Sequence, residues 1–129
     1  MKRVLYKTMP LAVVLLVVSL SIAYTIRQAH GGLSLQKVQV EQVCMVNDSF
    51  GGKPQIPVMV DDKTYYGCCP GCAEKIKNDL SVRIATDPVS GAKVDKAKAV
   101  TSADDNGKVF YFENEENFGK FVETEKDKK

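Results

Sequence analysis

From residue 40 onward, short apolar runs alternate with polar turns, and one order of segments occurs twice. The first copy has an apolar run, a Gly- and Pro-rich loop, two β-rich runs around a polar turn, and a helical stretch, at residues 43–47, 51–57, 58–66 and 68–80. Short β-branched or aromatic runs on either side of a polar turn predict a β-hairpin. Ile76 and Leu80, four residues apart, predict the apolar face of a helix that Pro70 can begin.

The second copy has the same order of loop, hairpin and helix, at residues 87–91, 99–112 and 113–122. Phe118, Phe121 and Val122 form the apolar face of its helix. Aligning the hairpins gives a period of about 45 residues. This alignment places polar residues where the first copy has cysteines: Asp87 on Cys44, Glu113 on Cys68 and Asn117 on Cys72, with Ser90 on Asn47. The second copy therefore has the scaffold of the first but none of its thiols.

These segments predict an α+β fold of two small units, each made of a knuckle, a β-hairpin and a helix, after an N-terminal hydrophobic helix. Units of about 40 residues are marginally stable alone and gain stability by packing together or by binding a metal. The expected order is a signal peptide or membrane anchor, a linker, the first unit, the second unit and a charged tail, at residues 1–26, 27–39, 40–84, 85–123 and 124–129.

The N-terminal segment resembles an export signal or a membrane anchor. Three basic residues precede an uncharged run of 19 residues, 8–26, whose centre is mostly Leu, Val and Ala. As a helix rising about 1.5 Å per residue, this run would cross the roughly 30 Å of membrane hydrocarbon, whereas Ser21-Ile22-Ala23 offers a cleavage site. Because the basic residues come first, we expect the rest of the chain at the periplasmic face of the cytoplasmic membrane, single-pass anchored or secreted.

Charge excludes one class of partner. Without Lys2, Arg3 and Lys7, 15 of the 18 lysines and arginines remain, against 16 acidic residues. This balance argues against a nucleic-acid partner. The alternating charges of residues 123–129 are typical of a solvated chain end.

The cysteines carry the candidate chemistry. Three of the four lie within Cys68-Cys69-Pro70-Gly71-Cys72, and the fourth, Cys44, completes a C-x23-C-x3-C spacing. Thiolates are soft ligands that select Cu(I), Zn(II) or similar ions. A hairpin that ends at Cys68, just before a helix with Cys72 in its first turn, brings two sulfurs to one side, where Cys44 can close the site. We therefore expect one soft metal ion bound by Cys44, Cys68 and Cys72.

The sequence does not identify a fourth ligand. Cys69 is adjacent, although successive residues at a helix entrance usually point in different directions. The other candidates are the oxygens of Asn47 or Asp48, His30 and Met45. Three thiolates without a fourth ligand suit trigonal Cu(I), whereas structural zinc sites normally have four ligands, so copper is favoured over zinc.

The first copy, Cys44 with Tyr65-Tyr66-Gly67-Cys68-Cys69-Pro70-Gly71-Cys72, resembles the TRASH domain, a small treble-clef-like metal-binding module. The second copy, with Asp87-Pro88-Val89-Ser90-Gly91 and 107–112, is similar to the related YHS domain, which usually has Cys where Ser90 stands. The resemblance implies two treble-clef-like units. It also implies a role in heavy-metal buffering, trafficking or resistance, with Cys44, Cys68 and Cys72 as ligands and a metal efflux or acceptor protein as partner.

Three alternatives compete with this interpretation. Export would allow two structural disulfides, although the clustering of the cysteines disfavours local pairing. Cys69-Pro70-Gly71-Cys72 matches the C-x-x-C of a thiol–disulfide oxidoreductase, but the pattern of a thioredoxin-like fold is missing. The loop at 67–76 also resembles that of heavy-metal-associated metallochaperones, which lack an upstream knuckle cysteine. We expect a metal-binding protein rather than an enzyme.

Overall fold

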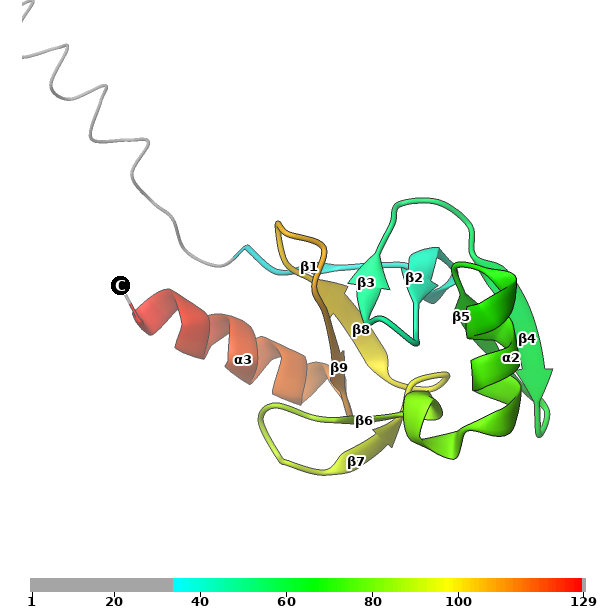
Figure 1. Cartoon of the computed structure of the whole chain (residues 1–129). Helices are drawn as coiled ribbons and strands as arrows, with labels where there is room; N and C mark the ends of the chain where they lie inside the picture. The colour runs from blue at the N-terminus through cyan, green and yellow to red at the C-terminus, as the bar shows by residue number, and fades with distance from the viewer. Residues whose placement is uncertain (1–33, 129) are drawn as a thin grey trace, which may run out of the picture. The chain divides into compact units, whose positions relative to one another are not determined.

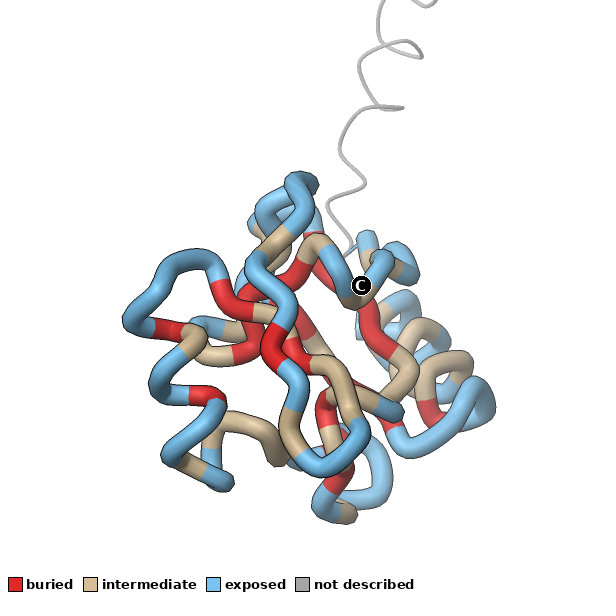
Figure 2. Tube along the Cα trace, turned by 90° about the vertical axis from the view of Figure 1, so that its right-hand side faces the viewer, coloured by how far each residue is buried: buried red, intermediate tan, exposed pale blue. Residues whose placement is uncertain are grey.

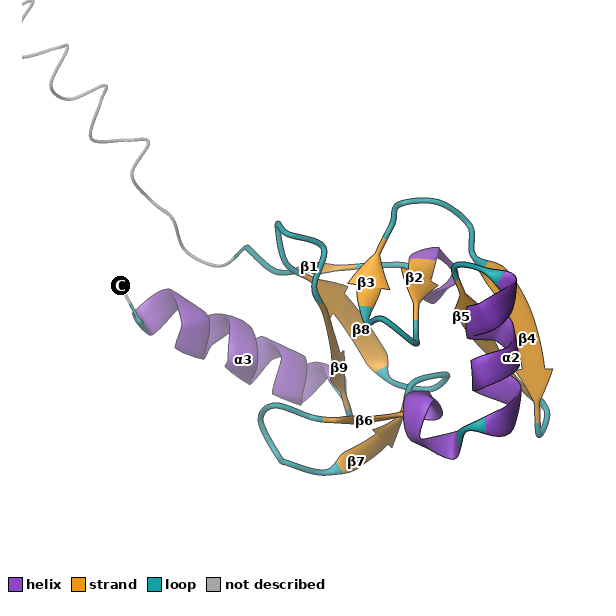
Figure 3. Cartoon of the chain, in the orientation of Figure 1, coloured by secondary structure: helices purple, strands orange, loops and turns teal. Residues whose placement is uncertain are grey.

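Two β-hairpins followed by a helix occur twice in succession within residues 34–128, the part of the chain that the computed structural model describes (Figure 1). The first copy contains β2 (Val43–Cys44), β3 (Ser49–Phe50), β4 (Ile56–Val60), β5 (Lys63–Gly67) and α2 (Pro70–Asn78). The second contains β6 (Ile84–Thr86), β7 (Lys93–Asp95), β8 (Val100–Ala103), β9 (Val109–Phe112) and α3 (Glu115–Asp127). Helices and small antiparallel sheets together confirm the α+β class (Figure 3).

Three short elements complete the described chain. β1 (Gln36–Lys37) pairs with β8, so that β1, β8 and β9 form one three-stranded sheet. The segment expected as a linker at 27–39 thus contains a strand near its end. The 3₁₀ helices η1 (Val40–Gln42) and η2 (Leu80–Arg83) precede β2 and β6.

The N-terminal hydrophobic helix and the membrane segment predicted at 8–26 lie outside the described residues. Within residues 34–128, no helix is both long enough and apolar enough to cross a membrane.

The predicted hairpins are confirmed, and their turns explain their register. β4 pairs with β5 from Ile56 opposite Gly67 to Val60 opposite Lys63. The two connecting residues, Asp61 and Asp62, have φ angles of 49° and 60°. Two successive positive φ angles are those of the tight turn that matches the twist of paired strands.

Both helices begin in the same way. Cys69 precedes α2, and its Sγ atom accepts a hydrogen bond from the backbone N–H of Cys72. Asn114 precedes α3, and its Oδ1 atom accepts from the N–H of Asn117 at 2.9 Å. Each cap satisfies a backbone donor that the first helical turn leaves free.

α2 and α3 end at other residues than the predicted helical stretches 68–80 and 113–122. α2 stops at Asn78, and Leu80 lies in η2 with 63% of its surface exposed, so the predicted apolar pair with Ile76 is wrong for Leu80. α3 continues past Val122 to Asp127, and an ion pair between Lys120 and Glu116 supports its exposed side.

One hydrophobic core contains residues of both copies, and Figure 2 shows the buried positions in red. The first copy contributes Val43, Met45, Val58, Tyr65 and Ile76, and the second contributes Val94, Ala103, Val109 and Tyr111. The backbone also joins the copies, because Phe50 N–H donates to the Gly107 carbonyl at 2.8 Å. The two copies of described residues therefore fold as one compact unit.

Candidate metal centre

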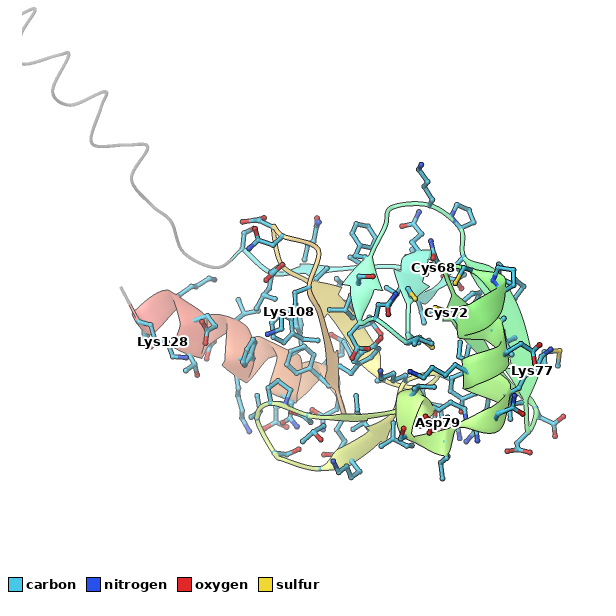
Figure 4. All side chains as sticks on the ribbon, in the orientation of Figure 1. Cys68, Cys72, Lys77, Asp79, Lys108 and Lys128 are labelled. Carbon is cyan, nitrogen blue, oxygen red and sulfur yellow. The ribbon has the colours of Figure 1, made fainter. Side chains whose placement is uncertain are left out.

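Three cysteine sulfurs lie within 4.8 Å of one another. Cys44 is the last residue of β2, Cys68 follows β5, and Cys72 lies in the first turn of α2, where Figure 4 labels the last two. The Cys72 Sγ atom lies 3.9 Å from that of Cys44 and 3.6 Å from that of Cys68. All three are free thiols. The structure thus brings together the three residues that the spacing predicted as ligands.

The two sulfur–sulfur separations that involve Cys72 match those expected around one metal ion. Three sulfurs in a tetrahedral arrangement at about 2.3 Å from an ion lie about 3.8 Å from each other. The distances from the Cys72 sulfur to those of Cys68 and Cys44, 3.6 Å and 3.9 Å, lie on either side of this value. The three cysteines can therefore hold one metal ion.

The backbone around β5 sets the position of two of the ligands. The N–H of Met45 donates to the Tyr66 carbonyl at 2.9 Å and ties the chain after Cys44 to β5. A Cβ atom at Gly67 would lie 3.0 Å from the Cβ of Cys72 and 3.2 Å from the backbone of the same residue. A glycine at 67 therefore lets the first turn of α2 approach β5 closely enough for Cys72 to join the cluster.

Gly67→Ala should destabilise the fold by about 1–3 kcal/mol, because the added methyl group overpacks a buried contact with Cys72. It should also weaken metal binding by displacing that thiol. Gly119→Ala is the matched control, since a Cβ there meets nothing within 4 Å. In the interior of α3 this change should stabilise by up to about 1 kcal/mol. Urea unfolding of both variants measures the difference, and equal stabilities would contradict the packing argument.

The three sulfurs differ in exposure. Cys44 and Cys72 are 2% and 9% exposed, whereas Cys68 is an exposed residue. An ion bound by all three would therefore be reached from the side of Cys68. The Asn47 side-chain amide lies on this side, with Nδ2 at 3.7 Å from the Cys68 sulfur.

The surroundings shift the pKa values of the three thiols in different directions. Burial opposes ionisation of Cys44, but hydrogen bonds from the backbone of Asn47 and from the Cys68 thiol lower its pKa. Donation of the Cys68 thiol to Cys44 raises the pKa of Cys68. Burial, followed by hydrogen bonds with the other cysteines, raises the pKa of Cys72 to about 12. Cys68 and Cys72 are therefore protonated at neutral pH.

Metal binding should release at least two protons per ion at pH 7, because Cys68 and Cys72 bind as thiolates but are thiols before binding. The affinity should consequently fall by at least about 100-fold for each pH unit below neutrality, about tenfold per proton released. Competition titrations near pH 6, 7 and 8 with a chelator of known protonation measure this slope. A change of less than about tenfold per unit would contradict the assigned protonation states.

Cys69 is not part of the sulfur cluster. Its exposed thiol caps α2, and hydrogen bonds from Cys72, first through the backbone N–H, lower its pKa. The other proposed ligands also have different roles among the described residues. The Asp48 carboxylate pairs with Lys96, and Met45 is fully buried in the core. His30 lies outside the described residues.

The second copy has a hydrogen-bonded cluster at the equivalent positions. Asp87 is fully buried, and its Oδ2 atom accepts from the side chain of Asn117 and from the backbone N–H of Glu113, each at 2.8 Å. Its Oδ1 atom accepts from the N–H groups of Val89 and Ser90. The alignment of the copies predicted these positions, but not that a carboxylate and an amide bind each other where the first copy has thiols.

Comparisons of this chain with protein-family models, with curated proteins and with solved structures found no match.

Proposed function

We propose that this protein binds one soft metal ion through Cys44, Cys68 and Cys72 and acts, without catalysis, in metal buffering, trafficking or resistance. The observation that carries the proposal is the cluster of three free sulfurs within 4.8 Å, contributed by residues 28 positions apart at the extremes. Three thiols that converge on one point without forming a disulfide are stabilised in that arrangement by a soft cation.

Cu(I) is the preferred ion, with Zn(II) second. Among the described residues, the cluster has three sulfur ligands, and Asn47 offers only an amide contact to Cys68. Three thiolates satisfy trigonal Cu(I), whereas structural zinc normally takes four ligands. A ligand from the solvent or from a partner would be needed to complete a zinc site.

The family and the location belong to the same proposal. The resemblance to TRASH and YHS domains favours two treble-clef-like units, of which the first binds metal and the second provides packing. The basic and apolar N-terminus favours export to the periplasmic face, with residues 8–26 as the anchor if they are retained. A metal efflux or acceptor protein would be the partner.

Anaerobic titration of the reduced full chain tests the proposal. Cu(I), titrated in the presence of a chromophoric competitor, should bind with a stoichiometry of about one ion per chain. Zn(II) should bind with the same stoichiometry but with lower affinity. Two intact disulfides in freshly isolated, metal-free protein would contradict the proposal and support the structural-disulfide alternative.

A thiol–disulfide oxidoreductase is the second candidate. Cys69 favours it, because this exposed thiol at the start of α2 has a lowered pKa and is followed by the buried Cys72. In that case the protein would reduce insulin, and Cys69→Ser would abolish the activity. Under the metal-binding proposal, neither the full chain nor Cys69→Ser should reduce insulin above background.

A further inference from the structure

A lysine of the second copy is buried against the chain that follows Cys44. Lys96 comes directly after β7, and its side chain is only 4% exposed. Its Nζ atom donates to the carbonyl oxygen of Met45 at 2.7 Å. Burying an ammonium group costs free energy unless it is paired and hydrogen-bonded, so the contacts of this group are specific ones.

Two more groups surround the Lys96 ammonium. It pairs with the carboxylate of Asp48 and lies 5.0 Å from the centroid of the Tyr111 ring. Tyr111 is itself 3% exposed. The lysine therefore has a carbonyl, a carboxylate and an aromatic ring as neighbours, and the first two belong to the turn between β2 and β3.

This turn, residues 45–48, is the knuckle of the candidate metal centre. Asp48 has a φ of 49°, a left-handed conformation that few residues other than glycine adopt. Its carbonyl oxygen accepts from the N–H of Val109 at 3.0 Å. The second copy thus holds the turn at its first residue through Lys96 and at its last residue through both Lys96 and β9.

The same turn determines the surroundings of one ligand. Cys44 immediately precedes it; burial opposes ionisation of the Cys44 thiol, but backbone N–H groups, first that of Asn47 and then that of Val46, lower its pKa. These donors and the sulfur move together when the turn moves. A change of turn conformation would therefore change both the place of Cys44 in the cluster and its hydrogen bonds.

We propose that Lys96 is a positioning residue of the metal centre, which fixes the 45–48 turn and so sets the position of Cys44 relative to Cys68 and Cys72. This inference rests on the proposed metal binding. It gives the second copy a specific role, because folding of that copy completes the metal site of the first. The ammonium also offsets the net negative charge of a metal bound by three thiolates.

The test compares Lys96→Met with Lys98→Met, a change at an exposed lysine two residues away. The reduced full chain is titrated with Co(II), whose sulfur-to-metal charge-transfer absorption reports the number of bound thiolates. For Lys96→Met we expect a loss of about 10- to 100-fold in affinity, the range for changes to residues that orient a metal ligand. At saturation we also expect a loss of about a third of the charge-transfer intensity, the share of one thiolate in three. Lys98→Met should match the wild type in both.

The saturated spectrum separates positioning from stability. A variant that is only less stable would be fully folded and filled at saturating Co(II), and its spectrum would equal that of the wild type. Folded Lys96→Met with wild-type affinity and intensity would overturn the inference while leaving the proposed function intact. A wild-type chain that binds neither Co(II) nor Cu(I) would overturn both.

Asp48→Asn provides the second variant, which decides the matter if Lys96→Met does not fold. Asparagine tolerates the left-handed conformation at this position, so the turn can form. The change removes the carboxylate partner of Lys96 while leaving the bond to the Met45 carbonyl. We expect an affinity about three- to tenfold lower, since one of two polar contacts is lost. An unchanged affinity and spectrum would overturn the inference.

Discussion

Cys44→Ser is expected to lower the affinity for Cu(I) by about 100-fold or more. Cys44 is separated from the cysteine-rich segment by 23 residues, yet its sulfur is 3.9 Å from that of Cys72 and buried beside it. A serine hydroxyl is a hard and poor ligand for a soft ion, so the site would keep two thiolates. The loss should exceed the roughly 10- to 100-fold that is typical when a residue that only orients a ligand is changed, because here a ligand itself is removed.

Cys69→Ser is the matched control. Cys69 is the immediate neighbour of Cys68 but caps α2 outside the sulfur cluster. Serine is a good helix cap, so both the fold and the affinity should remain within about threefold of the wild type. Competition titrations of the two variants give the answer directly. A large loss of affinity with Cys69→Ser and none with Cys44→Ser would reverse the assignment of ligands.

Asp87→Asn is expected to destabilise the fold by about 3–5 kcal/mol. The buried carboxylate accepts four hydrogen bonds, from the side chain of Asn117 and from the backbone N–H groups of Glu113, Val89 and Ser90. An asparagine in its place would direct its side-chain NH₂ group at N–H donors that now bond one of the carboxylate oxygens. Each unsatisfied buried donor costs about 1–3 kcal/mol, and hydrogen bonds to a charged acceptor are among the stronger ones.

The effect should depend on pH in a definite direction. Burial opposes ionisation, but the surrounding N–H donors, led by the backbone of Glu113 and the side chain of Asn117, lower the pKa of Asp87. A carboxyl group with a lowered folded pKa stabilises the fold above its unfolded pKa of about 3.9, and this stabilisation is lost as the pH falls through the folded value. The difference between wild type and Asp87→Asn should therefore be largest near neutral pH and shrink below about pH 4.

Urea unfolding at several pH values measures both parts of this prediction. Asp105→Asn is the control, because Asp105 is exposed and its change should stay within about 0.5 kcal/mol. A small, pH-independent effect of Asp87→Asn would mean that the second copy does not depend on the cluster that replaces the thiols.

Local patterns predicted the elements that local chemistry determines. Asp61-Asp62 and 104–107 are turn sequences, and both connect the hairpin strands that were expected. Pro70 begins α2 because a missing N–H costs nothing in a first helical turn. The order of knuckle, hairpin and helix in the first copy, together with the cysteine spacing, then predicted that Cys44 lies beside Cys68 and Cys72.

Contacts between the copies could not be predicted in this way. Lys96 reaches Met45 across 51 residues, and nothing in the sequence near Lys96 distinguishes it from the other lysines of the chain. β1 pairs with β8 through only two residues, too few to show an alternating pattern. Leu80 has the right spacing for the face of α2, but the helix ends before it, at Asn78.

X-ray absorption at the copper edge of the reduced, copper-loaded full chain tests the central claim most directly. Binding by Cys44, Cys68 and Cys72 predicts a first shell of three sulfur atoms at about 2.3 Å, falling to two in Cys44→Ser and unchanged in Cys69→Ser. A first shell made mainly of nitrogen or oxygen, or a sulfur count that does not change with Cys44→Ser, would contradict it.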